Sequence, residues 1–419
     1  MSASRNSALS GRVAFTYPSF RFYIWARFFI VLATEMQSVA VGWQVYEITR
    51  RPLDLGFVGL AQFLPGIVLF LLAGYIADRY DRRKVLMFGY VGFGVCSALL
   101  LSATVSGTRS VNWIYAIMVL VGVVRSLNTP ASRAILPLLV PAEHFQNGVV
   151  WNGIAFQTAN ILGPAAGGLA YTVFHGAAAV YAMALAAALG AALSMARITF
   201  IRPQRRGDMS QSAFLAGFRY IWNHQIILGS ISLDMFAVLL GGAVALLPVY
   251  AKDVLRTGPW GLGLLRCAPA IGAGLTAAVL AYRPLRRKTG ITLFVCVAGF
   301  GLFTILFGVS RNMALSIFAL ILVGATDMVS VVIRAVLVQL TTPDEMRGRV
   351  VAVDMIFIGT SNELGAFESG ATAQLFGTVP AVVIGGVGTL VVTALCALLF
   401  PQLRRADELA SREAESAAR

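Results

Sequence analysis

The chain of 419 residues has few charged side chains and lacks the residue clusters on which many enzymes depend. Only 12% of its residues are charged, whereas 58% are hydrophobic. Its three histidines and four cysteines stand apart, without CxxC or metal-ligand spacing. It has no Gly-x-x-x-x-Gly-Lys-Ser/Thr loop for ATP, no His-Glu-x-x-His and no Gly-x-Ser-x-Gly. We therefore expect neither an enzyme nor a bound cofactor or metal.

What the chain has instead is a series of long apolar runs, with a mean hydropathy of +0.77. A soluble protein of this length could not bury so much apolar surface in its cores. Each run of about 20 residues is long enough to cross the ~30 Å hydrocarbon layer, where water cannot satisfy the backbone. The alternation typical of a membrane β-barrel is missing. We predict an all-α integral membrane protein.

Twelve spans are predicted, and their loops sort by charge. The spans lie near residues 20–46, 56–77, 84–106, 112–136, 144–174, 177–200, 224–250, 258–282, 290–310, 312–337, 347–376 and 380–401. Arginine and lysine gather after spans two, six, eight and twelve, at residues 79–84, 202–206, 283–288 and 404–405. Cytoplasmic loops carry this excess, so we expect both termini in the cytoplasm of a cell with an inner (plasma) membrane. The net charge of +14 then reflects loops, and we expect no nucleic-acid partner.

One stretch of the chain is echoed in its second half. Asn, Leu, Gly, Gly and Phe recur in register between residues 160–174 and 362–376, an offset of 362 − 160 = 202. A repeat at half the chain length indicates two similar halves, a design typical of transporters. We predict a six-helix half at 1–201, a cytoplasmic linker with a short amphipathic helix at 202–223, a six-helix half at 224–403 and a tail at 404–419. That the linker helix only begins span seven one turn early stays open.

The loop between spans two and three carries a specific pattern, Gly74-Tyr-Ile-Ala-Asp78-Arg79-Tyr-Asp81-Arg82-Arg83-Lys84. A glycine at Gly74 lets neighbouring helices approach closely. An acid at Asp78, at the membrane boundary, can accept hydrogen bonds from the amides at the start of a facing helix. The arginines can hold acids or lipid phosphates. This pattern resembles motif A of the major facilitator superfamily, which Gly74, Asp78, Arg79, Arg82 and Arg83 match, with Asp81 in place of the usual second glycine.

A second motif lies in predicted span five, at Gly163, Pro164, Gly167 and Gly168. It resembles motif C of the same superfamily, which is associated with exporters that work as antiporters. Proline removes a backbone hydrogen bond and bends a helix, while glycines allow close packing. The motif therefore predicts a hinge and a seal; an ordinary glycine-rich membrane helix is the alternative.

The resemblance to the superfamily extends over nearly the whole chain and is greatest to the branch of enterobactin exporters and macrolide-efflux proteins. Phrases such as 342–349 and 365–370 carry the likeness to this branch. The resemblance implies the major facilitator fold, with twelve transmembrane helices in two pseudo-symmetric halves, alternating access and proton antiport. The partners it implies are a small amphipathic solute, protons and membrane lipids, and we expect a monomer.

Charged residues inside the spans are the candidates for a proton or substrate site, because each costs about 2.5–3.5 kcal/mol at the bilayer centre. We rank Asp234 first and Glu35 second, since Gln37 and its polar neighbours offer Glu35 partners. For each acid, a fixed buried ion pair is the alternative. Arg27 lies in span one, Arg334 is expected as a helix-end anchor, and Asp354 is expected to be structural. The other candidates are Arg125, Arg266, Asp327, Glu363 and Glu368.

We interpret the chain as a secondary active exporter of a siderophore or drug in the inner membrane. A lysophospholipid or other lipid transporter of the same fold is the first alternative. A non-transporting membrane scaffold or sensor is the alternative of another class, and the lack of a sizeable soluble domain weighs against it.

The motif A acid gives the first prediction. If Asp78 latches the cytoplasmic side, Asp78→Asn removes the charge that holds a facing helix terminus. Transport in a vesicle assay should fall while the amount of protein in the membrane stays the same. Normal transport by this variant would show that Asp78 has no latch role.

Overall fold

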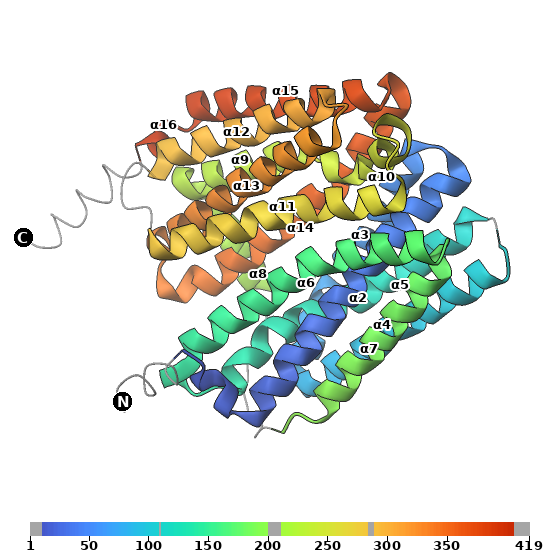
Figure 1. Cartoon of the computed structure of the whole chain (residues 1–419). Helices are drawn as coiled ribbons and strands as arrows, with labels where there is room; N and C mark the ends of the chain where they lie inside the picture. The colour runs from blue at the N-terminus through green and yellow to red at the C-terminus, as the bar shows by residue number, and fades with distance from the viewer. Residues whose placement is uncertain (1–10, 109, 200–210, 284–288, 406–419) are drawn as a thin grey trace, which may run out of the picture. The chain divides into compact units, whose positions relative to one another are not determined.

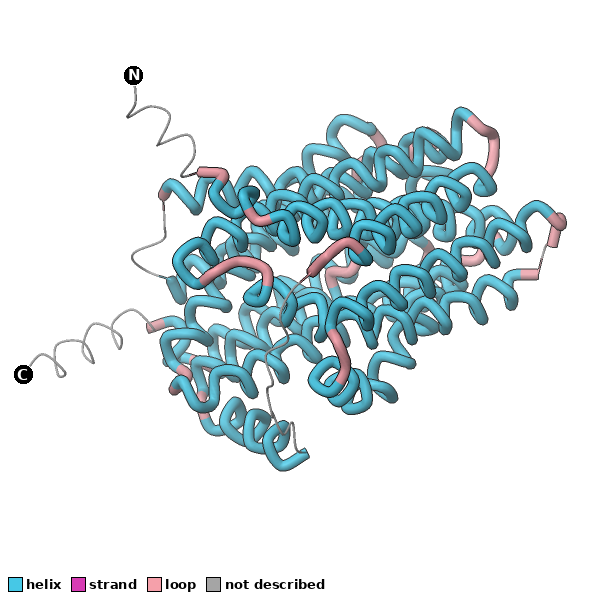
Figure 2. Tube along the Cα trace, turned by 90° about the horizontal axis from the view of Figure 1, so that it is seen from below, coloured by secondary structure: helices cyan, strands magenta, loops and turns pink. Residues whose placement is uncertain are grey.

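A computed structural model describes residues 11–108, 110–199, 211–283 and 289–405. Within these ranges, the side chains of residues 70–71, 77–78, 211–215 and 344 are excepted. Four parts of the predictions therefore lie outside the described residues: residues 202–210 of the predicted linker at 202–223, residues 284–288 of the cationic loop, residues 406–419 of the predicted tail at 404–419, and the side chain of Asp78. The described part consists of helices and loops (Figures 1 and 2).

Twelve long helices follow one another in the described chain. They are α2 (Pro18–Thr49), α3 (Pro52–Arg79), α4 (Arg82–Val105), α5 (Val111–Ile135), α6 (Phe145–Val173), α7 (Ala177–Ala196), α9 (Gln225–Leu240), α11 (Gly258–Tyr282), α12 (Thr289–Val309), α13 (Met313–Thr341), α14 (Asp344–Phe376) and α15 (Thr378–Leu399). The other helical segments are shorter. They are η1 (Val13–Thr16), η2 (Leu136–Leu138), η3 (Ala142–His144), α8 (Gln211–Asn223), η4 (Ala243–Leu246), α10 (Leu247–Val249), η5 (Tyr250–Val254) and α16 (Pro401–Arg404).

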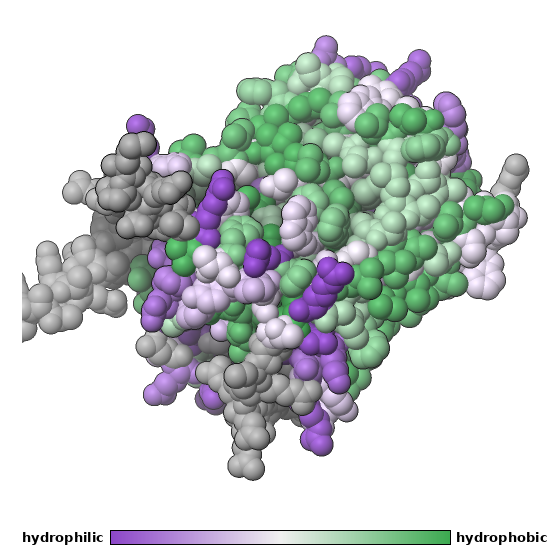
Figure 3. All heavy atoms as spheres, turned by 60° about the horizontal axis from the view of Figure 1, so that its bottom comes forward, coloured by the Kyte–Doolittle hydropathy of each residue, from purple (hydrophilic) through white to green (hydrophobic). Residues whose placement is uncertain are grey.

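Eleven candidate spans among the described residues are long and apolar enough to cross a membrane. The long helix outside this set is α6, which has 29 residues. Its first half carries the polar side chains of Asn147, Asn152 and Gln157, which lower its hydropathy. Outside the contacts between helices, large hydrophobic side chains such as Leu193 and Leu398 are exposed. Hydrophobic residues also cover much of the face seen in Figure 3, as expected of a surface that meets lipid.

The chain divides into two compact units that do not follow the sequence strictly. The first comprises Met1–Thr49, Ala61–Asp208 and Gly258–Cys267, and the second Arg50–Leu60, Met209–Thr257 and Ala268–Arg419. The first residues of α3 thus belong to the second unit, and the first residues of α11 to the first unit. Each of these two helices contains a proline shortly after it changes unit, Pro65 in α3 and Pro269 in α11.

The first unit packs α2 against α6 and α7, and α4 against α5 and α7. Small buried side chains on α7, among them Ala184, Ala188 and Ala191, allow the neighbouring helices to approach. Polar groups within this packing find partners across the helices. The Tyr181 hydroxyl donates to Gln44 Oε1 at 2.7 Å, and Ser97 Oγ donates to Gln37 Oε1 at 2.7 Å.

The second unit packs α12 against α13 and α15, and α9 against α14 and α15. A hydrophobic cluster includes Leu233 of α9, Leu293 of α12 and Ile333 of α13. Helix α8 is separate from α9, because His224 between them has an extended backbone. It lies against α14, where Phe218 stacks on Phe357 with ring centres 6.4 Å apart, and the Tyr220 hydroxyl donates to the carbonyl of Thr341, the last residue of α13, at 2.9 Å. Its predicted place on the membrane surface remains a prediction.

Helix α4 begins where the sequence departs from motif A. Asp81 has an extended backbone, and its side chain accepts a hydrogen bond from the Arg83 amide at 3.0 Å. Aspartate is among the best N-cap residues, since its carboxylate satisfies an amide that the helix leaves unpaired. The acid that replaces the usual glycine therefore starts α4.

This cap gives a stability prediction. Asp81→Ala should lower the free energy of unfolding of the purified protein by about 1 kcal/mol, whereas Asp81→Asn should keep most of it because asparagine also caps helices. Chemical unfolding in detergent, followed by circular dichroism, measures the difference. Equal stability of the alanine and asparagine variants would contradict the capping role.

Candidate functional site

The predicted hinge in α6 packs against α2 through its glycines. A Cβ atom at Gly163 would lie 2.6 Å from Cβ of Glu35, and one at Gly167 would lie 2.9 Å from Cα of Met36. Contacts this short leave no room for a side chain. Gly163 and Gly167 therefore bring the backbones of α6 and α2 together at the level of Glu35.

The opposite side of the same motif packs against the start of α11, within the first unit. A Cβ atom at Gly168 would lie 2.6 Å from the Pro259 carbonyl oxygen, and one at Gly263 would lie 2.6 Å from the Pro164 carbonyl oxygen. Pro164 is buried inside α6 and cannot donate a backbone hydrogen bond there. The motif is thus held between α2 and α11. Its glycines allow the close packing, and Pro164 leaves one backbone hydrogen bond of the helix unmade.

An acid and an arginine meet beside this crossing. Arg266 of α11 lies with Nε 3.9 Å from Glu35 Oε2, and its Nη2 donates to Ser38 Oγ at 2.5 Å. Both charged side chains are partly exposed, Glu35 at 31% and Arg266 at 23%. The structure therefore joins two residues that the sequence singled out separately. Gln37, expected as a possible partner of Glu35, bonds Ser97 instead.

Arg27, one of the charged residues that the sequence placed in span one, bonds α5. Its Nη1 donates to Ser132 Oγ at 3.2 Å, and its guanidinium lies 5.0 Å from the centre of the Phe156 ring. Arg125, on the same helix as Ser132, is exposed, and its carbonyl accepts from Thr129 Oγ1 at 2.8 Å. Arg27 and Arg125 therefore add two cations to the polar sides of α2 and α5.

The second unit holds a buried charge cluster made by three helices. Arg334 of α13 lies with Nη2 3.2 Å from Asp234 Oδ2 of α9, and its Nη1 donates to Asp354 Oδ1 of α14 at 2.8 Å. The side chains of Arg334, Asp234 and Asp354 are only 4%, 8% and 13% exposed. The sequence placed Asp234 at membrane depth but treated Arg334 as a helix-end anchor. That expectation was wrong, since α13 buries Arg334 between two acids.

The remaining acidic candidates lie outside the ion pairs of Arg334. Asp327 is seven residues before Arg334 on α13, hence on the same helix face. On α14, Glu363 lies close to Gly59 of α3, and Glu368 Oε1 accepts from Thr372 Oγ1 at 2.7 Å. The structure therefore gathers Asp234, Asp354 and Arg334 into one cluster and leaves Glu363 and Glu368 on another part of α14.

The motif A arginines bind helix ends within the first unit. Arg82 Nη1 donates to the Ala134 carbonyl in the last turn of α5 at 2.9 Å, and Arg83 Nη1 donates to the Ile198 carbonyl just after α7 at 2.6 Å. Arg79 lies over the Tyr75 ring at 5.7 Å, and Gly74 is part of α3. Cations near the negative C-terminal ends of helices are favourable. These arginines tie the loop to α5 and α7.

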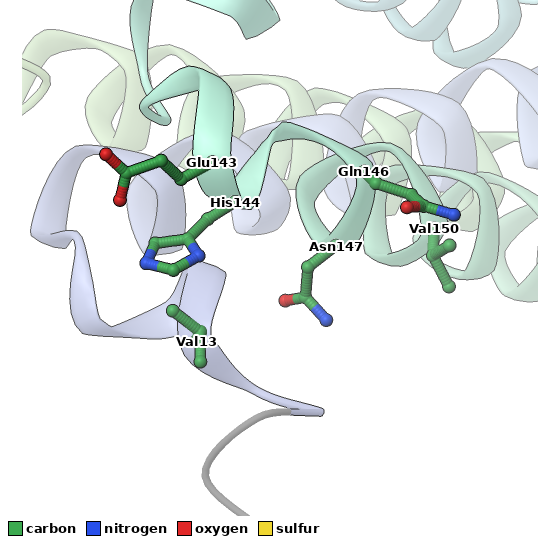
Figure 4. A pocket seen from close by; sticks show the side chains of 6 residues that line it. All are labelled: Val13, Glu143, His144, Gln146, Asn147 and Val150. Carbon is green, nitrogen blue, oxygen red and sulfur yellow. The ribbon is translucent and has the colours of Figure 1, made fainter.

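A surface pocket lies where η1 approaches the start of α6. It is lined by Val13, Glu143, His144, Gln146, Asn147 and Val150 (Figure 4). The Asn147 amide group already bonds the chain beside it, donating to the Gly11 carbonyl at 2.9 Å and accepting from the Ala14 amide at 3.1 Å. Asn147 therefore serves to attach η1 to α6, and we assign no ligand to this pocket.

Comparison with known proteins agrees with the fold. A family model described as transmembrane secretion effector matches residues 10–417. The chain belongs to this family. The enterobactin exporters EntS of Shigella boydii serotype 18 and of Escherichia coli O81 are each 26% identical to it over 399 residues, which cover 93% of this chain and 94% of theirs.

Solved structures show the same fold at low sequence identity. The nucleoside transporter NupG has a TM-score of 0.71 at 12% identity, with 91% of this chain and 99% of that one covered. A bacterial homologue of the human lysosomal transporter Spinster, inward-facing and unoccupied, has a TM-score of 0.69 at 13% identity, covering 93% of this chain and 98% of that one. The predicted major facilitator fold is confirmed. The chain is a multi-pass inner-membrane transporter of a small solute and not an enzyme.

The glycine crossing predicts a steric effect with an internal control. Gly167→Ala, or the larger Gly167→Leu, should force α6 away from Met36 and destabilise the protein by about 1–3 kcal/mol, with loss of transport. Gly153→Ala on the same helix should lower neither stability nor transport, because no atom lies within 4 Å of its Cβ position. Thermal unfolding and solute efflux are measured for both. Full efflux with bulky residues at Gly163 and Gly167 would show that the motif is ordinary helix.

Proposed function

We propose that the chain is a proton-driven antiporter that exports an amphipathic small molecule, either a siderophore or a drug. The family match supports transport, and the relatives named as enterobactin exporters support an exported siderophore. Motif C is complete at Gly163, Pro164, Gly167 and Gly168. It supports antiport, because the motif it resembles is associated with exporters that work as antiporters. The lack of a phosphate-binding loop in the sequence supports an ion gradient as the energy source.

The observation that carries the proposal is the cluster of Asp234, Arg334 and Asp354. One guanidinium faces two carboxylates in a site from which water is largely excluded. Burial of an unbalanced charge costs several kcal/mol, so binding of one proton to either acid would stabilise the cluster. Coupled acids of this kind take up protons as a unit, and the proton belongs to the pair more than to one residue.

The three helices of the cluster give it a route to conformational change. Asp234, Arg334 and Asp354 lie on α9, α13 and α14, so any shift among these helices alters their distances. When Arg334 moves away from one acid, the positive charge that keeps that carboxylate ionised is lost. The carboxylate then binds a proton more readily. We assign proton coupling to this cluster, with Asp234 as its first candidate and Asp327 on the same face of α13 as a further acid.

The two motifs supply gate and hinge in this proposal. On the cytoplasmic side, Gly74 permits close helix packing, Asp78 latches a facing helix, and Arg79, Arg82 and Arg83 hold the loop in place. In α6, Pro164 weakens the helix and its glycines keep it in contact with α2 and α11. Glu35 and Arg266 lie beside this hinge, so their ion pair is a second place where movement changes a charge contact.

We also propose an oligomeric state, an orientation in the membrane and further site candidates. The chain works as a monomer surrounded by lipid, with both termini in the cytoplasm. Glu363 and Glu368 of α14 are reserve candidates for the proton or substrate site. The loop cations after spans two, six, eight and twelve support the orientation.

Proteoliposomes loaded with enterobactin test the coupling. An imposed pH gradient should drive enterobactin movement by the wild-type protein, and Asp234→Asn should abolish the dependence on the gradient while exchange of solute without a gradient persists. Glu35→Gln is measured separately. If the wild-type protein moves no enterobactin, the siderophore assignment is wrong.

Asp253→Asn provides a matched control for the coupling experiment. Asp253 also pairs with an arginine, Arg50, at 3.6 Å in the second unit, but its side chain is 44% exposed and it lies at the end of its span. This variant should keep the full response to the gradient. Wild-type gradient dependence in both Asp234→Asn and Glu35→Gln would exclude these acids and leave Glu363 and Glu368 to be tested.

A further inference from the structure

Charged side chains deep within the described spans are divided unevenly between the two units. These side chains lie at least seven residues from both ends of their span. Arg334 is the one nearest to a span end, seven residues before Thr341. In the first unit these are three arginines, Arg27, Arg125 and Arg266, with Glu35 as the acid. In the second unit they are five acids with Arg334 as the cation: Asp234, Asp327, Asp354, Glu363 and Glu368. The interior of the first unit is therefore cationic, and that of the second is anionic.

The cations of the first unit lie along faces of α2 and α5 that contact each other. Arg27, Thr34 and Ser38 are seven and four residues apart on α2, and Arg125 and Ser132 are seven apart on α5, so each set shares a helix face. The bond from Arg27 to Ser132 joins the two faces. Arg125 is exposed at the middle of its span. Cations at this depth face water or protein and not lipid, so these faces turn away from the lipid.

Arg27 is poorly balanced by the chain itself. Among the described residues, its guanidinium contacts the Ser132 hydroxyl and the Phe156 ring but no carboxylate. Its Nε is buried and has no hydrogen-bond partner. A buried donor without a partner costs about 1–3 kcal/mol, and more when it is charged. The geometry therefore provides a guanidinium with an unused donor beside an aromatic ring.

Arg266 is held by its acid only loosely. Its distance to Glu35 is 3.9 Å, whereas Arg334 and Asp354 are 2.8 Å apart in the second unit. Arg266 instead makes its short contact with the neutral hydroxyl of Ser38, at 2.5 Å. A second anion can therefore approach this guanidinium without breaking a tight ion pair.

We infer that this face of the first unit binds the anionic group of the exported solute. Arg27 is the principal cation, Arg266 and Arg125 add positive potential, and the Phe156 ring supports an aromatic part of the solute. A guanidinium recognises carboxylates and phenolates by charge-assisted hydrogen bonds. The chemical class is thus an amphipathic aromatic anion. The inference rests on the proposed export function, and it separates solute binding in the first unit from proton binding in the second.

Equilibrium binding to the purified full-length protein in detergent tests this inference without any gradient. Two probes of similar shape are titrated by calorimetry at neutral pH, the anion 2-naphthoate and the uncharged 2-naphthylmethanol. The wild-type protein should bind the anion about tenfold or more tightly than the alcohol, as expected for a charge-assisted hydrogen bond. Arg27→Gln should remove this preference, because glutamine keeps a donor for Ser132 but has no charge.

Arg197→Gln is the matched control. Arg197 also lies over a phenylalanine ring, 5.9 Å from that of Phe22, but it is exposed at the end of α7. This variant removes the same charge from the same unit and should keep the preference for the anion. Equal affinity of the wild-type protein for the two probes, or a preference retained in Arg27→Gln, overturns the inference.

A gain of affinity guards against a variant that merely fails to fold. Glu35→Gln removes the acid beside Arg266 and should tighten 2-naphthoate binding several-fold, with little effect on the alcohol. Weaker or unchanged anion binding in this variant counts against the site. Because no pH gradient is applied, these results do not depend on proton coupling. Loss of coupling with anion binding intact would separate the two proposals.

Discussion

The absence of water from the hydrocarbon layer is the constraint on which this structure depends. It forces the backbone into helices, and it also forces each polar side chain inside the helices to find a partner within the protein. The bonds of Gln37 with Ser97 and of Gln44 with Tyr181 meet that demand with neutral groups. Arg334 meets it with two acids. Arg27 meets it incompletely, because its buried Nε has no hydrogen-bond partner, and this is the cation to which we assign solute binding.

Close backbone contact is the second requirement of the fold, and glycine supplies it where helices cross. In α6, glycines on two sides of one helix meet α2 and α11, so a short motif serves two contacts at once. Burial of apolar side chains adds little in a membrane, since lipid is as apolar as the protein interior. The fit of the glycines, the hydrogen bonds and the charge pairs therefore carries a larger share of the packing than in a soluble bundle.

The sequence predicted the helices well because apolar runs of about 20 residues have few interpretations. The predicted span at 144–174 corresponds to α6 at Phe145–Val173, and that at 258–282 to α11 at Gly258–Tyr282. The motifs could be recognised because their glycines, proline and arginines have fixed spacing. The pairing of charges could not, since Arg334 and Asp234 are a hundred residues apart and nothing local indicates that α9 and α13 meet. Asp81 was a signal within reach, because an acid before a helix predicts a cap.

The sharing of α3 and α11 between the units has a mechanical consequence. A helix that is continuous through two bodies transmits force along its axis, and it resists bending except where its hydrogen-bond ladder is broken. Pro65 lies five residues after Leu60, and Pro269 lies two residues after Cys267, close to the points where each helix changes unit. The prolines therefore make α3 and α11 easier to bend close to the points where each helix changes unit.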